Sequence, residues 1–275
     1  MKADIAFGQY FEGKSFIHKL CPKWKILFAI FFIVILFLAK NIWSFALITA
    51  AALCLVLMSR VSPGILLRGL RPLILIIVFT SLINVFWYQG ETPLFEYGII
   101  HIYVEGVTNA VLIVLRVILL VAVTSIILTY TTTPIALTDG IEQLLYPLSK
   151  LKVPVHEFSM MMTIALRFIP TLIEETDKIM SAQKARGADF SEGSLVKRAK
   201  ALVPILVPLF VSAFRRASDL ACAMECRCYT GGEGRTRMNT LKSSWRDLVM
   251  LLFLCAVCAG VVLINKFIPG YVLTL

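Results

Sequence analysis

The chain of 275 residues carries a formal net charge of +10 and is 59% hydrophobic, with a mean hydropathy of +0.84. Soluble globular domains are about 45–50% apolar, so this composition excludes a soluble protein and indicates an integral membrane protein. We predict an all-α fold with about five transmembrane helices and long amphipathic helices on the cytoplasmic side.

The N-terminal 25 residues are polar and mixed in charge, so we expect no cleavable signal peptide and expect the first span to direct insertion. About 20 mostly apolar residues cross the hydrocarbon core of a bilayer. The segments that meet this rule are residues 26–39, 42–58, 72–88, 107–130 and 248–264. The first of these is short, and the fourth contains Arg116.

The positive charges predict the orientation of the spans, because cytoplasmic loops retain Lys and Arg. Lys14, Lys19, Lys23 and Lys25 precede the first span, three arginines lie in the loop near residues 60–71, and 16 of the 27 basic residues lie in 131–247. The only basic residues in the loops on the opposite side are Lys40 and Lys266. Five spans then place the N-terminus in the cytoplasm and the C-terminus outside.

The long basic segment predicts two amphipathic helices. Apolar residues recur at helical spacing before a glycine stop at Gly187, and Pro170 predicts a kink. In the second helix, Ala213, Ala217 and Ala221 are spaced four apart, which allows another helix to cross closely. We therefore predict three parts: an N-terminal membrane domain of about four spans (1–130), cytoplasmic coupling helices (131–246) and a C-terminal transmembrane helix (247–275).

Each amphipathic helix ends in a similar hexapeptide. The first is Ala-Gln-Lys-Ala-Arg-Gly at 182–187 and the second is Ala-Met-Glu-Cys-Arg-Cys at 223–228. An arginine between small residues can enter an acidic groove of a partner while the backbone approaches closely. Binding of lipid headgroups is the alternative, but it requires no such spacing or small neighbours. The candidate docking residues are Ala185, Arg186, Gly187, Cys226, Arg227 and Cys228.

Two other classes of function stay open. A membrane-embedded enzyme would need a catalytic group, yet the three histidines are scattered and the thiols of Cys255 and Cys258 lie within a span. A self-sufficient carrier would need polar groups along a path, and only Arg116 and Asn84 stand out. The sequence has no phosphate-binding loop of the G-x-x-x-x-G-K-[ST] type. The glycines at 231–234 have neither the spacing of this motif nor its Lys followed by Ser or Thr. We expect no enzyme activity and no cofactor or metal.

The sequence closely resembles the transmembrane (T) component of energy-coupling factor transporters, the bacterial ATP-driven importers of vitamins and metal ions. The resemblance spans nearly the whole chain, and the stretch at 223–236 is the most specific part. The matching stretches are 8–10 (Gly-Gln-Tyr), 18–25 (His-Lys-Leu-Cys-Pro-Lys-Trp-Lys), 185–187 and 223–236. Two departures stand out: the second Ala-Arg-Gly motif reads Cys226-Arg227-Cys228, and Cys21 replaces the family's usual acidic residue.

The resemblance implies a scaffold without catalysis of its own. It implies two cytoplasmic ATP-binding cassette ATPases as partners, each receiving one arginine-bearing helix end, and a separate membrane (S) subunit that binds the substrate. The implied location is the bacterial plasma membrane, so lipid is a further partner and nucleic acid is not. With Cys228 in the glycine position of the motif, Gly231 is the alternative stop of the second helix. Lys184 and Glu225, two residues before each arginine, could distinguish two non-identical ATPases.

Overall fold

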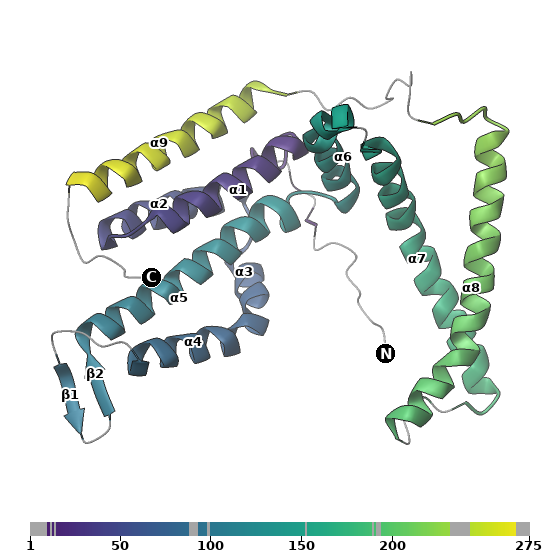
Figure 1. Cartoon of the computed structure of the whole chain (residues 1–275), viewed down its shortest axis with the longest axis horizontal. Coiled ribbons are helices and arrows are strands. Elements are labelled where there is room, and N and C mark those ends of the chain that lie inside the picture. Colours follow the sequence, from purple (N-terminus) through teal and green to yellow (C-terminus); the bar gives the residue numbers. More distant parts are fainter. Residues whose placement is uncertain are drawn as a thin grey trace. The chain divides into compact units, whose positions relative to one another are not determined.

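The computed structural model describes residues 10–11, 13, 15–87, 93–97, 100–151, 153–188, 190, 194–231 and 243–267. Its described part is almost entirely helical, as predicted, and Figure 1 shows the elements in chain order. The longer helices are α1 (Pro22–Leu38), α2 (Ile42–Ser59), α4 (Ile74–Trp87), α5 (Val104–Thr124), α7 (Val155–Ala185), α8 (Leu195–Glu225) and α9 (Trp245–Phe267). The shorter ones are α3 (Pro63–Leu70), η1 (Arg71–Leu73), η2 (Ser125–Tyr130), α6 (Pro134–Leu145) and η3 (Tyr146–Leu151).

The chain divides into two compact units. One unit comprises residues 1–143 and 241–275, and the other comprises residues 144–240. The first contains α1 to α6 and α9, and the second contains η3, α7 and α8. The insertion of the second unit between α6 and α9 makes the first unit discontinuous in sequence.

Five helical stretches of the described residues are long and apolar enough to span a membrane: Ile42–Ser59, Gly64–Phe86, Val104–Tyr130, Lys200–Glu225 and Trp245–Phe267. Four of them coincide with predicted spans. The predicted first span corresponds to α1, whose 17 residues stand at the lower limit of the usual length. The stretch in α8 was predicted to be amphipathic, and its uncharged part, residues 201–214, is shorter than about 20 residues.

A β-hairpin precedes α5 and was not predicted. Strands β1 (Pro93–Tyr97) and β2 (Ile100–Tyr103) pair antiparallel, with Tyr97 opposite Ile100 and Pro93 opposite Tyr103. An irregularity in the pairing lies between Pro93 and Phe95. The hairpin is the only β structure in the described ranges, so the class remains all-α.

The core of the first unit lies where α9 packs against α1 and α2 and where α5 packs against α1, α2 and α4 (Figure 1). Its largest fully buried side chains include Phe28, Phe32, Phe45 and Tyr130. The low amphipathicity of α1 and α2 fits this environment, because a helix with protein on one face and lipid on the other is apolar all round.

One buried carboxylate holds the starts of the first and last long helices together. Asp247 Oδ2 accepts the Ser244 N–H at 2.7 Å, which is one of the two hydrogen bonds of a capping box at the start of α9. Asp247 Oδ1 accepts the Cys21 N–H at 3.0 Å, directly before Pro22 opens α1. The Asp247 carboxylate thus bonds the backbone at position 21, where the family usually has an acidic residue, but among the described residues no side chain caps the first N–H groups of α1.

A second polar joint lies beside the first. Lys25 is almost fully buried, and its Nζ donates to the Thr131 carbonyl at 2.7 Å and to the Thr132 hydroxyl at 3.2 Å. A buried ammonium group is tolerated only when its donors are satisfied. This joint fixes α1 to the chain that leaves η2.

Arg116 has a structural environment inside the first unit. Its guanidinium donates to the Ala39 carbonyl at 3.1 Å and lies 5.4 and 5.3 Å from the ring centroids of Phe37 and Phe45. Ala39 is the C-terminal cap of α1 and is buried, so this hydrogen bond satisfies an otherwise orphaned helix carbonyl. Asn84 bonds the Thr80 carbonyl of its own helix. Each of these two polar side chains thus has a structural partner.

Replacement of Arg116 by alanine is expected to lower the free energy of unfolding by about 2 kcal/mol, because a charged hydrogen bond and two cation–π contacts are lost. Thermal unfolding in mild detergent measures the change. Arg116→Lys keeps the charge and one donor and should lose less. An alanine variant as stable as wild type would contradict the structural role.

Candidate coupling site

Helix α7 forms the first arm of the site. Its 31 residues begin after Pro154 and contain Pro170 internally. The predicted apolar stripe is present: Ile164, Phe168 and Leu172 line one side of a groove of about 240 Å³ between α7 and α8. The stripe therefore faces the second arm.

Helix α8 forms the second arm and also has 31 residues. Ala213, Ala217 and Ala221 line the other side of the groove, together with Leu220 and Met224. Their spacing places small side chains at the contact, and α7 and α8 cross like an X in Figure 1. The close crossing expected from the alanine spacing is confirmed by these contacts.

An ion pair links the two arms next to the groove. Arg216 Nη2 donates to Glu175 Oε2 at 2.9 Å, and the two side chains are 39% and 23% exposed. A hydrogen bond from the Ser212 hydroxyl and the contacts of the Arg216 guanidinium hold the pKa of Glu175 below its usual range. A lowered pKa means that acidification through the carboxylate range weakens this link. At neutral pH the crossing is fixed by apolar packing and by one charged contact.

The first motif ends α7 with a Schellman arrangement. Gly187 has φ +85°, its N–H bonds the Lys184 carbonyl at 3.0 Å, and the Ala188 N–H bonds the Gln183 carbonyl at 3.0 Å. The left-handed conformation is the reason for glycine at this position. The predicted stop at Gly187 is thus present, and Arg186 is the residue just before the turn.

The second motif ends α8 in the same way. Cys228 has φ 57°, its N–H bonds the Glu225 carbonyl at 2.8 Å, and the Tyr229 N–H bonds the Met224 carbonyl at 3.0 Å. Each of these atoms corresponds to one in the first motif 41 positions earlier. The helix therefore stops at Cys228 itself, although Gly231 also has a positive φ of +102°. The remaining predicted turn glycines, Gly232 and Gly234, lie outside the described residues.

Both arginines are exposed and available to a partner. Arg186 and Arg227 lie between exposed neighbours, at 185 and 187 and at 226 and 228. Among the described residues, neither guanidinium has a hydrogen bond or ion pair. The docking role of the six motif residues stays a prediction, and sequence reasoning did not single out the Glu175–Arg216 ion pair, whose members also stand 41 positions apart.

Replacement of Cys228 by glycine is expected to stabilise the end of α8 by about 1 kcal/mol, because a residue with a Cβ pays that cost in the left-handed region. Hydrogen exchange of the Cys228 and Tyr229 amides should slow about fivefold. Gly187→Ala is the matched opposite change and should speed exchange at Gly187 and Ala188. Unchanged hydrogen exchange in both variants would contradict the conclusion that the backbone of Cys228 is strained.

The residues considered for catalysis do not assemble into a site in the part of the chain that the structure describes. No group of three or more His, Cys, Asp and Glu side chains there could hold a metal ion. Cys255 and Cys258 are free thiols in α9. His18 instead bonds its neighbours: its Nδ1 lies 2.6 Å from the Ser15 hydroxyl and its Nε2 lies 2.8 Å from the Phe11 carbonyl.

Fold and site together define a multi-pass membrane protein with a crossed pair of amphipathic helices. The family of cobalt transport proteins named CbiQ matches residues 13–240. Relatives named energy-coupling factor transporter transmembrane protein EcfT include one from Clostridium kluyveri, 51% identical over 95% of this chain and 97% of its own length. The Ruminiclostridium cellulolyticum and Bacillus subtilis proteins of that name are 49% and 46% identical, over 91% and 94% of this chain and 93% and 97% of their own lengths. The chain belongs to this family of transmembrane (T) components of energy-coupling factor transporters.

Proposed function

We propose that this chain is the non-catalytic subunit that transmits ATP-driven motion from two cytoplasmic ATPases to a separate substrate-binding membrane subunit. The observation that carries the proposal is the pair of equivalent helix ends. Each presents an exposed arginine one residue before a left-handed stop, and the two stops share the same hydrogen-bond pattern. Two structurally equivalent helix ends fit the binding of two ATPases of similar structure.

In the proposed mechanism the two helices act as crossed levers. Arg186 and Arg227 each enter an acidic groove of one ATPase, and the small neighbours at 185, 187, 226 and 228 allow close approach of the backbones. When the ATPases close on ATP, the two helix ends move relative to each other. The Glu175–Arg216 contact and the apolar groove keep the crossing packed, so the motion passes along α7 and α8.

The proposed location is the bacterial plasma membrane, with the N-terminus and residues 131–246 in the cytoplasm. Residues 1–130 and 247–275 would then form the membrane part. The distribution of Lys and Arg supports this orientation. The charges near the two helix ends differ, because Lys184 lies two residues before Arg186 and Glu225 lies two residues before Arg227. This difference in charge suits two non-identical ATPases.

Affinity purification of the tagged full chain in mild detergent tests the proposal. Two ATPases and a small membrane protein should co-purify with wild type, and the preparation should hydrolyse ATP. The Arg186→Ala, Arg227→Ala double variant should lose the ATPases but keep the membrane partner. A chain that purifies alone, or a double variant that retains both ATPases and uptake, would overturn it.

A further inference from the structure

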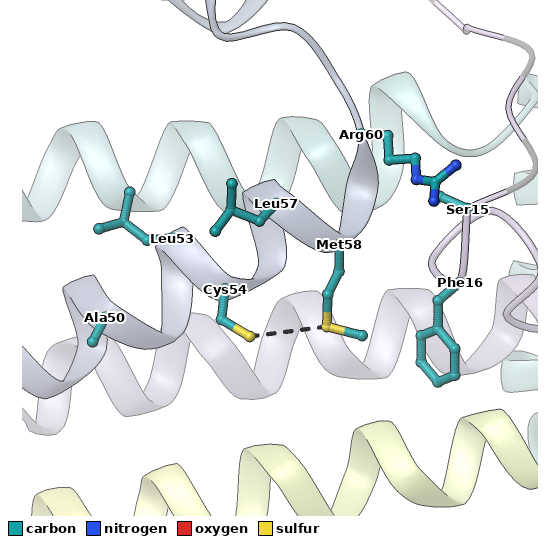
Figure 2. A pocket seen from close by; sticks show the side chains of 8 residues that line it. All are labelled: Ser15, Phe16, Ala50, Leu53, Cys54, Leu57, Met58 and Arg60. Atoms are coloured by element: carbon teal, nitrogen blue, oxygen red, sulfur yellow. Dashed lines mark hydrogen bonds between the residues drawn. The ribbon is translucent and has the colours of Figure 1, made fainter.

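An open groove runs along α2 in the first unit. Its volume is about 750 Å³, and it is lined by Ser15, Phe16, Ala50, Leu53, Cys54, Leu57, Met58 and Arg60. Figure 2 shows Ala50 at one end of this row and Arg60 with Ser15 and Phe16 at the other. One end is therefore ionic and the rest is apolar.

The apolar part continues past Ala50. A second groove of about 590 Å³ shares Ala50 and Leu53 with the first and runs between α2 and α5, lined almost wholly by apolar side chains. Among the shared lining residues, Leu53 is 57% exposed, and Leu57 in the first groove is 77% exposed. This first unit thus presents one apolar channel to the bilayer along α2.

The length of the first groove, from Ala50 to Arg60, fits the depth of one leaflet. Ten residues separate Ala50 from Arg60, and at 1.5 Å per helical residue they span about 15 Å. The hydrocarbon core is about 30 Å thick, so one leaflet accounts for about half of it. A chain anchored at Arg60 would end near Ala50.

The charge of Arg60, at one end of the groove, favours an anionic lipid. Arg60 is exposed and is one of two described residues other than glycine with a positive φ, 57°, at the cap of α2. A planar guanidinium matches a phosphate oxygen pair. Ser15, which bonds the His18 ring, lines the same end of the groove, and Arg60 is the cation among the described lining residues.

We propose that this groove binds an anionic phospholipid, with its phosphate on Arg60 and an acyl chain along Ala50, Leu53 and Leu57. An amphiphile with one ionic end and one apolar chain matches a groove that is ionic at one end only. A transmembrane helix from a partner would need no cation there. The leaflet is the cytoplasmic one if the proposed orientation holds, but the binding itself does not depend on the ATPases.

Native mass spectrometry of the full chain in detergent micelles with equal phosphatidylglycerol and phosphatidylcholine tests the site. Wild type should retain phosphatidylglycerol preferentially. Arg60→Gln should retain about fivefold less, the effect expected for one basic residue near anionic lipid, and Arg68→Gln, an exposed arginine outside the groove, should match wild type. Equal retention by the Arg60 and Arg68 variants would overturn the proposal.

A second variant leaves Arg60 unchanged, so its result does not depend on whether the Arg60 variant folds. Leu53→Trp fills the groove and keeps Arg60, so it should also lose the lipid, whereas Leu252→Trp on the exposed face of α9 should not. A photo-cross-linking residue at position 57 then identifies the occupant in membranes. Adducts with phospholipid support the proposal. Adducts with a protein subunit would overturn it and show that the groove is a protein interface.

Discussion

Arg186→Ala and Arg227→Ala are each expected to weaken ATPase binding by about 2 to 5 kcal/mol, or about 30-fold to several thousand-fold. This is the usual cost of truncating one partner of a buried charge pair at an interface. Both arginines lie at equivalent helix stops and have no partner in the described part of this chain. Titration of purified ATPase onto each variant in lipid nanodiscs measures the affinity.

Two matched controls come from the same helices. Arg167 on α7 and Arg215 on α8 are also exposed arginines, and neither lies at a helix stop. Alanine at either position removes the same charge and should change the affinity by less than about threefold, the range for a screened surface charge. If the control variants lost as much affinity as the motif variants, net charge would explain the binding and the docking assignment would fail.

Asp247→Ala is expected to lower the free energy of unfolding by about 2 to 4 kcal/mol. The substitution removes the acceptor of two backbone N–H groups that start different helices, and each lost cap costs about 0.5–2 kcal/mol. The Cys21 N–H is then left buried without a partner, which adds to the cost. The melting temperature of the full chain in detergent reports the loss.

Asp247→Asn separates the two caps. Its amide oxygen can accept one N–H, but its amino group cannot accept the other, so the loss should be intermediate. Asp219→Ala removes an exposed aspartate from α8 and should leave the melting temperature unchanged. Equal melting temperatures for wild type and Asp247→Ala would contradict a shared cap.

Local sequence patterns were enough to predict the long helices and the stop at Gly187. Apolar length predicted α2, α5 and α9 to within a few residues, because crossing a bilayer requires a minimum length. The close crossing of α7 and α8 was expected from the four-residue spacing of Ala213, Ala217 and Ala221. These features depend only on neighbours within a helix turn or two.

Features that depend on distant partners were not predictable. Cys21 and Asp247 are 226 positions apart, so no local pattern reveals their bond. The sequence left the stop of α8 open between Cys228 and Gly231, because a residue other than glycine seldom adopts a positive φ, and the hydrogen bonds around Cys228 decide it. The β-hairpin was missed because Pro93 and the short strands gave no clear alternation of apolar and polar residues.

The bond between Cys21 and Asp247 also sets an order of events during synthesis. At about 5–20 residues per second, the ribosome needs roughly 10 to 45 s to travel the 226 residues that separate them. Throughout that interval the start of α1 lacks its acceptor, and the faces of α1 and α2 that pack against α9 have no partner. The first two helices therefore remain in the membrane without this partner, and the packing of the first unit is completed only after α9 has been synthesised.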